Sequence, residues 1–360
     1  MVAVACVVDD SSGSFCGVES LAKRRFGAAT VSRHDGRAIA AVHRALLCGT
    51  IAPMKAYRFC IPLSRPLKLK RETYSKREGV LIERDGKWAE ASPLPGFSLD
   101  SIDDVIGALR GQQANPKSLE FALSALSEPA ITKVSVPWNF LLLGDRQQVM
   151  AGVDRCLESG CSAAKLKVGR GDLQTEIELV KAVRDRLPSD VRLRLDANQA
   201  WTIDEATSFI DSLRGLDLEY IEEPLKNPQE LEQLFSQTGV RYALDESLSQ
   251  HADMDAWLEA CPNAAALICK PTILGGRADV QRLVATGKPI TFTAAFESGV
   301  GLARIVQLAA EFAPDCAAGL DTIDWLEHDL LLQSPSKQNG VFTVMGEPVV
   351  DRNQLEPITL

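Results

Sequence analysis

From residue 131 onward, short apolar runs alternate with amphipathic stretches such as DLQTEIELVKAVRDRL, and this alternation constrains the fold more than any other feature. Strands that alternate with helices indicate βαβ units and a parallel sheet. Eight units predict a closed (β/α)₈ barrel over residues 131–322. An open doubly wound sheet is the alternative, but no G-x-G-x-x-G follows the first run. The eight predicted strands are KVSVPWNFLLL, AAKLKVG, VRLRLDAN, LEYIEEP, VRYALDES, AALICKP, PITFTAAF and CAAGLDT.

Residues 54–130 have a different pattern. The segments KAYRFCIPLSRPLKL and REGVLIERDGKWAEASPL alternate in polarity like antiparallel strands, with a tight turn at Asp85 and Gly86. Two helical stretches follow, SLDSIDDVIGALRG and PKSLEFALSALSE. We therefore expect a small α+β domain before the barrel.

Residues 1–53 fit neither pattern. The opening MVAVACVVDD lacks the basic residues of a signal peptide, and its apolar run is short. Met54 resembles a natural start. We expect residues 1–53 to be an extension of uncertain structure, or a segment upstream of the native start, and assign them no function.

Composition excludes several classes of protein. The net charge of −9 and the pI near 5.2 argue against nucleic-acid binding. The sequence contains no run of 18 apolar residues, so it predicts no membrane-spanning helix. The nine cysteines are scattered without C-x-x-C spacing, and there are only four histidines, which predicts reduced thiols, a cytoplasmic location and no zinc site.

Charged residues stand at the carboxyl ends of five consecutive predicted strands. The steps are 29 residues from Lys167 to Asp196, then 26 to Glu222, 23 to Asp245 and 25 to Lys270. Each step is about one βα unit, so a barrel would bring these side chains to one mouth, where barrel active sites lie. One acid at a strand end is more often a helix cap or a surface ion pair, but a series in register indicates a site.

The residue types in this series suggest a reaction. Three carboxylates from adjacent strands form an oxygen site that suits Mg²⁺, with Mn²⁺ able to replace it. Lys165 and Lys167 are two apart on a strand and share a face. A lysine beside a cation and another lysine should have a lowered pKa and could abstract a proton next to a carboxylate. Glu223 and Glu246 are expected to support the site rather than bind the metal.

The series K-x-K, D-A-N, E-E-P, D-E-S and K-P-T resembles the enolase superfamily, in its muconate-lactonising subgroup, which uses such lysines together with Mg²⁺. The resemblance covers residues 54 to about 335. It implies a modified TIM barrel, residues 131–322, beneath an α+β capping domain, residues 54–130. It also implies that the C-terminal segment, residues 323–360, returns to the cap.

Three further strings resemble the o-succinylbenzoate synthase family of that subgroup. They are SPLPGFS at 92–98, FESGVGL at 296–302 and GLDT at 319–322. The resemblance implies a proton-abstracting Lys167 assisted by Lys165, and a Lys270 that stabilises the enediolate from the opposite side. It implies that the metal ligands are Asp196, Glu222 and Asp245, and that the substrate contacts are Arg194, Asn198, Thr293 and Gly319.

The implied reaction is the Mg²⁺-dependent dehydration of 2-succinyl-6-hydroxy-2,4-cyclohexadiene-1-carboxylate, in menaquinone or phylloquinone synthesis. An N-acylamino-acid racemase or dipeptide epimerase also places lysines on both sides of a metal, and stays open as an alternative. A metal-binding scaffold without activity is a third, opposed by the intact Lys167 and Lys270. The expected partner is a small-molecule substrate, not nucleic acid or a membrane, and the sequence does not indicate an oligomeric state.

Overall fold

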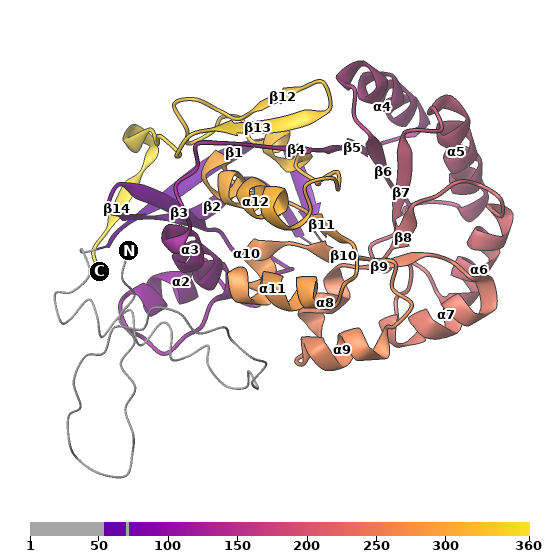
Figure 1. The fold of residues 1–360 in the computed structure, drawn as a ribbon, viewed down its shortest axis with the longest axis horizontal. Coiled ribbons are helices and arrows are strands. Elements are labelled where there is room, and N and C mark those ends of the chain that lie inside the picture. The colour runs from indigo at the N-terminus through magenta and orange to yellow at the C-terminus, as the bar shows by residue number, and fades with distance from the viewer. Residues whose placement is uncertain (1–53, 70–71) are drawn as a thin grey trace, which may run out of the picture.

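The computed structural model describes residues 54–69 and 72–360 (Figure 1), so the predicted extension lies outside the described residues. The described part of the chain begins with an antiparallel sheet in the order β14-β1-β2-β3. Asp85 and Gly86 join β2 to β3, both with positive φ, as a two-residue hairpin turn requires. The strands of this sheet are β1 (Lys55–Leu69), β2 (Glu72–Arg84), β3 (Lys87–Ala91) and β14 (Glu356–Ile358).

Two helices, α2 (Ile102–Leu109) and α3 (Lys117–Ser127), complete the cap. Ser101 and Asp104 form a capping box at the start of α2, which satisfies N–H groups that the helix itself leaves free. Apolar residues of both helices pack with β2 and β3 into one core cluster. The predicted α+β organisation of this region is therefore present.

The second sheet is parallel and has the order β11-β10-β9-β8-β7-β6-β5. Sequential strands are neighbours throughout, as expected for a right-handed series of βα units. Seven of the eight apolar runs thus contribute a strand to this sheet. The strands are β5 (Asn139–Leu142), β6 (Ala163–Lys167), β7 (Arg192–Asp196), β8 (Tyr220–Glu222), β9 (Tyr242–Leu244), β10 (Ala266–Cys269) and β11 (Ile290–Phe292).

The eighth run, CAAGLDT, closes the barrel without forming a regular strand. Its residues make isolated parallel bridges between Trp138 and Ala318 and between Thr293 and Gly319. The N–H of Gly319 bonds to the Phe292 carbonyl at 2.8 Å. These bridges join the two edges of the sheet, so the prediction of a closed barrel is confirmed. The eighth run contributes only isolated bridges where a full strand was expected.

The first run, KVSVPWNFLLL, is divided. Its first half is β4 (Lys133–Pro137), which pairs antiparallel with the C-terminal hairpin and not with the barrel, and only its second half is β5. The prediction of one barrel strand over this whole run was therefore wrong, because only its second half joins the barrel sheet. The hairpin strands are β12 (Ser336–Gln338) and β13 (Val341–Met345), and the chain then reaches β14, which pairs with β1.

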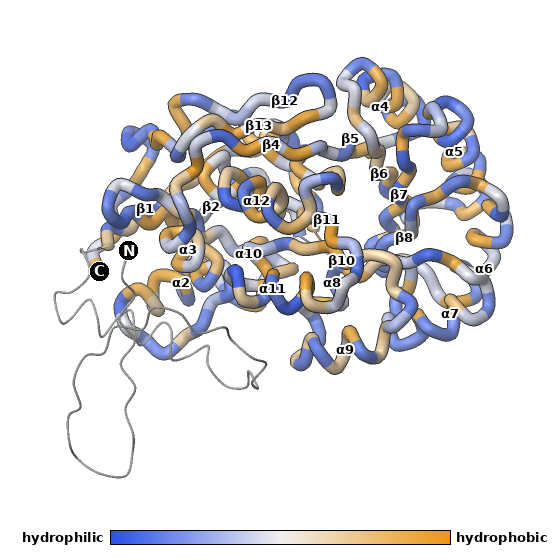
Figure 2. The backbone as a smooth tube through the Cα atoms, in the orientation of Figure 1, coloured by the Kyte–Doolittle hydropathy of each residue, from blue (hydrophilic) through white to orange (hydrophobic). Residues whose placement is uncertain are grey.

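Helices surround the barrel, and Figure 2 shows hydrophilic residues along their outer sides, with hydrophobic residues in inner strands such as β11. In the part of the chain that the structure describes, no helix is long and apolar enough to cross a membrane. The remaining helices are α4 (Arg146–Ser159), α5 (Leu173–Arg186), α6 (Ile203–Ser212), α7 (Leu231–Thr238), α8 (Glu246–Gln250), α9 (Met254–Ala260), α10 (Pro271–Leu274), α11 (Arg277–Ala285) and α12 (Gly299–Phe312), with 3₁₀ turns η1 (Pro228–Glu230), η2 (Asp321–Trp325) and η3 (Arg352–Gln354).

Candidate active site

Strand register brings the predicted charged residues to one end of the barrel. Lys167 is level with Asp196 on the next strand, and Asp196 is level with Glu222 on the strand after that. Asp245 and Lys270 are the residues that directly follow β9 and β10. Parallel strands therefore place the whole series at their carboxyl ends, as the spacing predicted.

Lysine side chains bridge the first two carboxylates. The Lys165 ammonium lies 2.6 Å from Asp196 and 2.6 Å from Glu222, and both carboxylates are buried. Lys167 also lies 2.6 Å from Asp196. The Lys167 side chain is 23% exposed and that of Lys165 only 10%. Of the two, Lys167 is the more accessible to a substrate.

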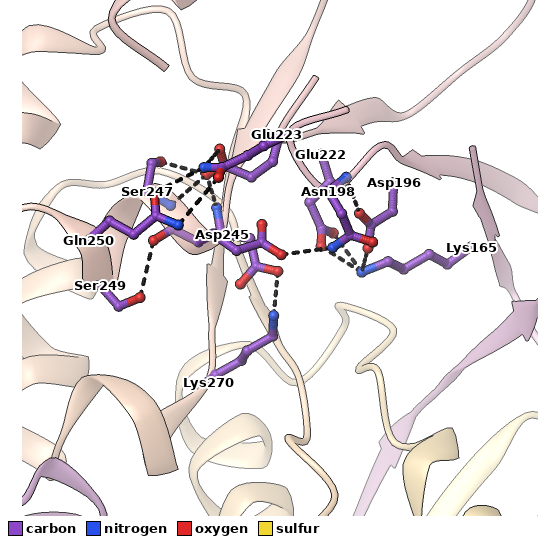
Figure 3. Close-up of polar contacts among 12 residues, drawn as sticks. Lys165, Asp196, Asn198, Glu222, Glu223, Asp245, Ser247, Ser249, Gln250 and Lys270 are labelled. Atoms are coloured by element: carbon purple, nitrogen blue, oxygen red, sulfur yellow. Dashed lines mark hydrogen bonds and ion pairs between the residues drawn. The ribbon is translucent and has the colours of Figure 1, made fainter. Parts of the chain in front are cut away.

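Lys270 belongs to the other side of the cluster. Its ammonium pairs with the carboxylate of Asp245. Figure 3 shows that Lys165 reaches Asp196 and Glu222 from the right, while Lys270 reaches Asp245 from below. A molecule held at the carboxylates would therefore lie near ammonium groups from two separate parts of the barrel.

The charges shift one another's ionisation. Burial opposes a charged Lys165, but Asp196 and Glu222 outweigh it and raise its pKa well above the ordinary value. Burial also opposes a charged Lys270, and Asp245 and Glu246 overcome it and raise that pKa. The carboxylate neighbours alone therefore raise the pKa of Lys165, and the lowered lysine pKa expected beside a bound cation stays a prediction. A raised pKa keeps Lys270 charged, as its implied role requires.

The donor chemistry of the cluster fits a divalent cation. Burial and the charge of Asp196 raise the pKa of Glu222 well above its ordinary value, so close carboxylates here need positive charge. Three carboxylates are the hard oxygen donors that Mg²⁺ prefers. Within the described residues, however, no three acidic, His or Cys side chains are arranged around a common cation position. The counter-charges present are the lysine ammonium groups.

Asn198 and two glutamates support the cluster. Asn198 accepts from Lys167 at 2.6 Å and donates to Glu246 at 2.7 Å, which links the loops after β7 and β9. Glu223 points away from the cluster, as expected for a neighbour on a strand, and accepts the N–H groups of Asp245 and Ser247. Its φ is +41°, a conformation that a non-glycine residue adopts at a cost.

Arg194 lies elsewhere in the barrel. It is fully buried, and its guanidinium donates to Glu219 at 2.6 Å, to Asn139 at 3.0 Å and to the Ala317 carbonyl at 2.6 Å. These partners lie toward the amino ends of the strands. The implied substrate contact of Arg194 stays a prediction, and it would require some of these hydrogen bonds to be exchanged.

Thr293 and Gly319 face each other at the closure of the barrel. A Cβ on Gly319 would lie 3.0 Å from the Thr293 hydroxyl, so the absence of a side chain permits this approach. Both residues are partly exposed at the carboxyl end of β11. Their contact with a substrate stays a prediction.

A small pocket beside Lys270 contains residues that sequence reasoning missed. Phe97 of the cap reaches it, and its ring centre lies 5.9 Å from the Lys270 ammonium. The string SPLPGFS contains Phe97, so the signal was present without a role attached to it. The pocket is lined by Phe97, Asp245, Glu246, Ser249, Ile268, Lys270, Ile273 and Leu274.

Comparison with known proteins agrees with this geometry. The family model "Enolase C-terminal domain-like" matches residues 148–348, more than half of the chain, and the chain therefore belongs to the enolase superfamily. Among curated relatives, o-succinylbenzoate synthase of Yersinia enterocolitica is 30% identical over 316 residues, covering 80% of this chain and 95% of the relative. That of Pectobacterium atrosepticum is 29% identical over 307 residues, covering 78% and 93%.

Solved structures agree on the fold. The L-Ala-D/L-Glu epimerase of Bacillus subtilis has a TM-score of 0.71 at 21% identity, covering 83% of this chain and 97% of its own. The Mg-complexed o-succinylbenzoate synthase of Thermosynechococcus elongatus has a TM-score of 0.67 at 23% identity, covering 78% and 96%. An enolase-type barrel with an antiparallel capping domain is thus established, and the protein is an enzyme of this superfamily that acts on a small molecule.

Proposed function

We propose that this enzyme is an o-succinylbenzoate synthase, which dehydrates 2-succinyl-6-hydroxy-2,4-cyclohexadiene-1-carboxylate to 2-succinylbenzoate for menaquinone or phylloquinone synthesis. The observation that carries the proposal is the pair of lysines, Lys167 and Lys270, which contact the first and the last of three buried carboxylates, Asp196 and Asp245. The similarity to curated synthases over most of their length supports this choice among the reactions of the superfamily.

Lys167 would perform both proton transfers. As a free amine it takes the proton from the ring carbon that bears the carboxylate. The ammonium so formed then gives a proton to the hydroxyl group on the adjacent carbon, which leaves as water from the same face. The ring becomes aromatic, which supplies the driving force. Lys167 must first release Asp196 and Asn198, its partners in this structure.

The other residues would stabilise the negative charge that develops on the substrate. Negative charge builds on the substrate carboxylate as the proton leaves, and the Lys270 ammonium stabilises it from the opposite face. Lys165 holds Asp196 and Glu222 in place and adds positive charge near Lys167. Asp196, Glu222 and Asp245 would hold the Mg²⁺ ion, which supplies further positive charge to the substrate carboxylate when bound.

An absorbance assay tests the proposal. Purified protein with Mg²⁺ is given the cyclohexadiene substrate, and loss of the diene absorbance is followed with and without EDTA. We expect rapid loss with Mg²⁺ that EDTA abolishes and added Mg²⁺ restores. No loss with Mg²⁺ present would refute synthase activity while leaving the family assignment unchanged.

Racemisation or epimerisation of an acylated amino acid or dipeptide is the second candidate. Lysines on both faces could remove the α-proton from one side and return it from the other, and the similar fold of the Bacillus subtilis epimerase gives this reaction a precedent. Incubation of chiral N-acylamino acids with the enzyme in deuterated water would reveal it by α-deuterium incorporation. Absence of exchange would exclude these substrates.

A further inference from the structure

A buried carboxylate of the cap lies at the N-terminus of a barrel helix. Glu90 is on β3, only 1% exposed, and it accepts the N–H of Ser298 at 3.1 Å and that of Gly301 at 3.0 Å. It also accepts from the hydroxyls of Ser298 and Ser92, at 2.5 and 2.7 Å. Ser298 is the N-cap of α12, where free N–H groups and the helix dipole favour a negative charge. Glu90 therefore joins the cap to the barrel.

Glycines make this approach possible. A Cβ on Gly301 would lie 3.1 Å from a Glu90 carboxylate oxygen and 2.7 Å from the Cβ of Glu297. A second carboxylate, Asp329 of the C-terminal segment, accepts the Gly299 N–H at 2.7 Å, and a Cβ on Gly299 would clash with it. Two carboxylates from outside the barrel thus share the first turn of α12, and only Glu90 comes from the cap.

Arg77 forms a second connection between the same two segments. It is buried on β2 and donates to the carbonyls of Ser92 at 2.9 Å and Pro93 at 2.9 Å. Its third bond, at 3.1 Å, goes to the carbonyl of Phe296 in the barrel loop that leads into α12. Arg77 and Glu90 thus fix the start of the cap loop, residues 92–98, against this barrel loop.

The cap loop forms one wall of the pocket. Leu94 packs against Ile273 and Ala295 of the barrel, and Phe97 lines the pocket beside Lys270. Inside the loop, the N–H groups of Phe97 and Ser98 bond to the Leu94 carbonyl at 3.0 and 2.8 Å. The loop is one hydrogen-bonded turn, so its fixed start determines where Phe97 lies.

We propose that Glu90 is a positioning residue that anchors the cap loop to the N-terminus of α12 and so holds Phe97 in the substrate pocket. Glu90 itself does not touch the reacting atoms. It acts through the position of a wall that contacts the substrate before and during reaction, so it governs KM more than kcat. The identity of the substrate, but not the anchoring, rests on the proposed function.

The test compares Glu90→Gln with Asp329→Asn. Both replace a carboxylate at the first turn of α12 with an amide, but the hydrogen bonds to the Asp329 carboxylate come from Gly299 and Leu330 and not from the cap loop. For Glu90→Gln we expect KM to rise about tenfold with kcat within about twofold, and for Asp329→Asn we expect a KM change below about twofold. In a Phe97→Ala background, Glu90→Gln should add little to KM, because the residue through which it acts is gone.

Hydrogen exchange provides a measurement that needs no substrate. We expect the hydrogen-bonded amides of Leu94, Phe97 and Ser98 to exchange at least about fivefold faster in Glu90→Gln and at the wild-type rate in Asp329→Asn. Equal exchange of these amides in wild type and Glu90→Gln, or an equal effect of both variants, would overturn the anchoring. Faster exchange in Glu90→Gln alone, with no dehydration by the wild type, would instead support the anchoring and refute the proposed function.

Discussion

Glu223 accepts the backbone N–H of Asp245 at 2.7 Å, so the second acid of the E-E-P motif fixes the residue that carries the third carboxylate of the cluster. The same carboxylate also accepts the Ser247 hydroxyl and the Gln199 side chain. Glu223 is buried, and its contacts in this structure hold the loop that follows β9.

Removing this support should weaken metal binding. In Glu223→Ala the Asp245 and Ser247 N–H groups lose their acceptor, and the Asp245 carboxylate loses its fixed position. We expect Mg²⁺ affinity to fall by about 10- to 100-fold, with most of kcat recovered at saturating Mg²⁺. Titration of activity with Mg²⁺ measures this, with Glu178→Ala on the exposed side of α5 as a control. An unchanged Mg²⁺ requirement would contradict the supporting role.

Glu222 should be a source of strain in the metal-free protein. Burial and the neighbouring charges of Asp196 and Asp245 raise its pKa, and Glu222→Gln removes that repulsion. We expect metal-free Glu222→Gln to melt no lower than the wild type. Saturating Mg²⁺, at 100 times the dissociation constant, should stabilise the wild type by about 2.7 kcal/mol and the variant hardly at all. Equal stabilisation of both by Mg²⁺ would exclude Glu222 as a ligand.

Glu90 should make stability depend on pH near neutrality. Burial raises its pKa to about 7 from an ordinary 4.5, against the opposing hydrogen bonds of Ser298 and Ser92. The folded state therefore favours the protonated form, so this stabilisation is complete below about pH 4.5 and is lost as pH rises through 7. The full change is on the order of 3 kcal/mol.

Urea unfolding of wild type and Glu90→Gln from pH 5 to 8.5 measures this difference. The wild-type midpoint should fall relative to that of the variant as pH rises through 7, because the glutamine does not titrate. Parallel midpoints over the whole range would show that the pKa of Glu90 is not raised.

Gly301 should not tolerate a side chain. Alanine would gain about 1 kcal/mol of helix propensity, but its Cβ would lie 2.7 Å from that of Glu297. The same Cβ would lie 3.1 Å from the Glu90 carboxylate, which its hydrogen bonds hold in place. We expect a net loss of about 1 to 3 kcal/mol in Gly301→Ala, typical of an overpacked interior. Gly171→Ala, with no atom within 4 Å of its Cβ, is the control. Equal thermal melting of the two variants would contradict the close packing.

The barrel and the site residues were predictable because they are local and periodic. Each charged residue follows an apolar run, and each βα unit repeats the same arrangement, so spacing alone placed Lys167, Asp196 and Glu222 at one mouth. Parallel pairing of successive strands needs no further information. The hairpin turn at Asp85 and Gly86 was equally local.

The rest depended on contacts between distant segments. Glu90 and Ser298 are 208 residues apart, and nothing in the segment KWAEA indicates that its glutamate accepts a hydrogen bond from the segment FESGVGL. The division of KVSVPWNFLLL was hidden because its first half pairs with β13, some 200 residues later. The resemblance implied a substrate contact for Arg194 but did not reveal that its guanidinium donates to Glu219.

The rate of dehydration by Lys167→Ala is the most direct test of the account. We expect the wild type with Mg²⁺ to consume the cyclohexadiene substrate rapidly, and Lys167→Ala to lose at least about 1,000-fold in kcat, since the proposed proton acceptor is gone. Mg²⁺ binding, measured by calorimetry, should be largely kept, and Lys181→Ala on the exposed side of α5 should be fully active. Turnover that survives in Lys167→Ala would show that the mechanism proposed for this cluster is wrong.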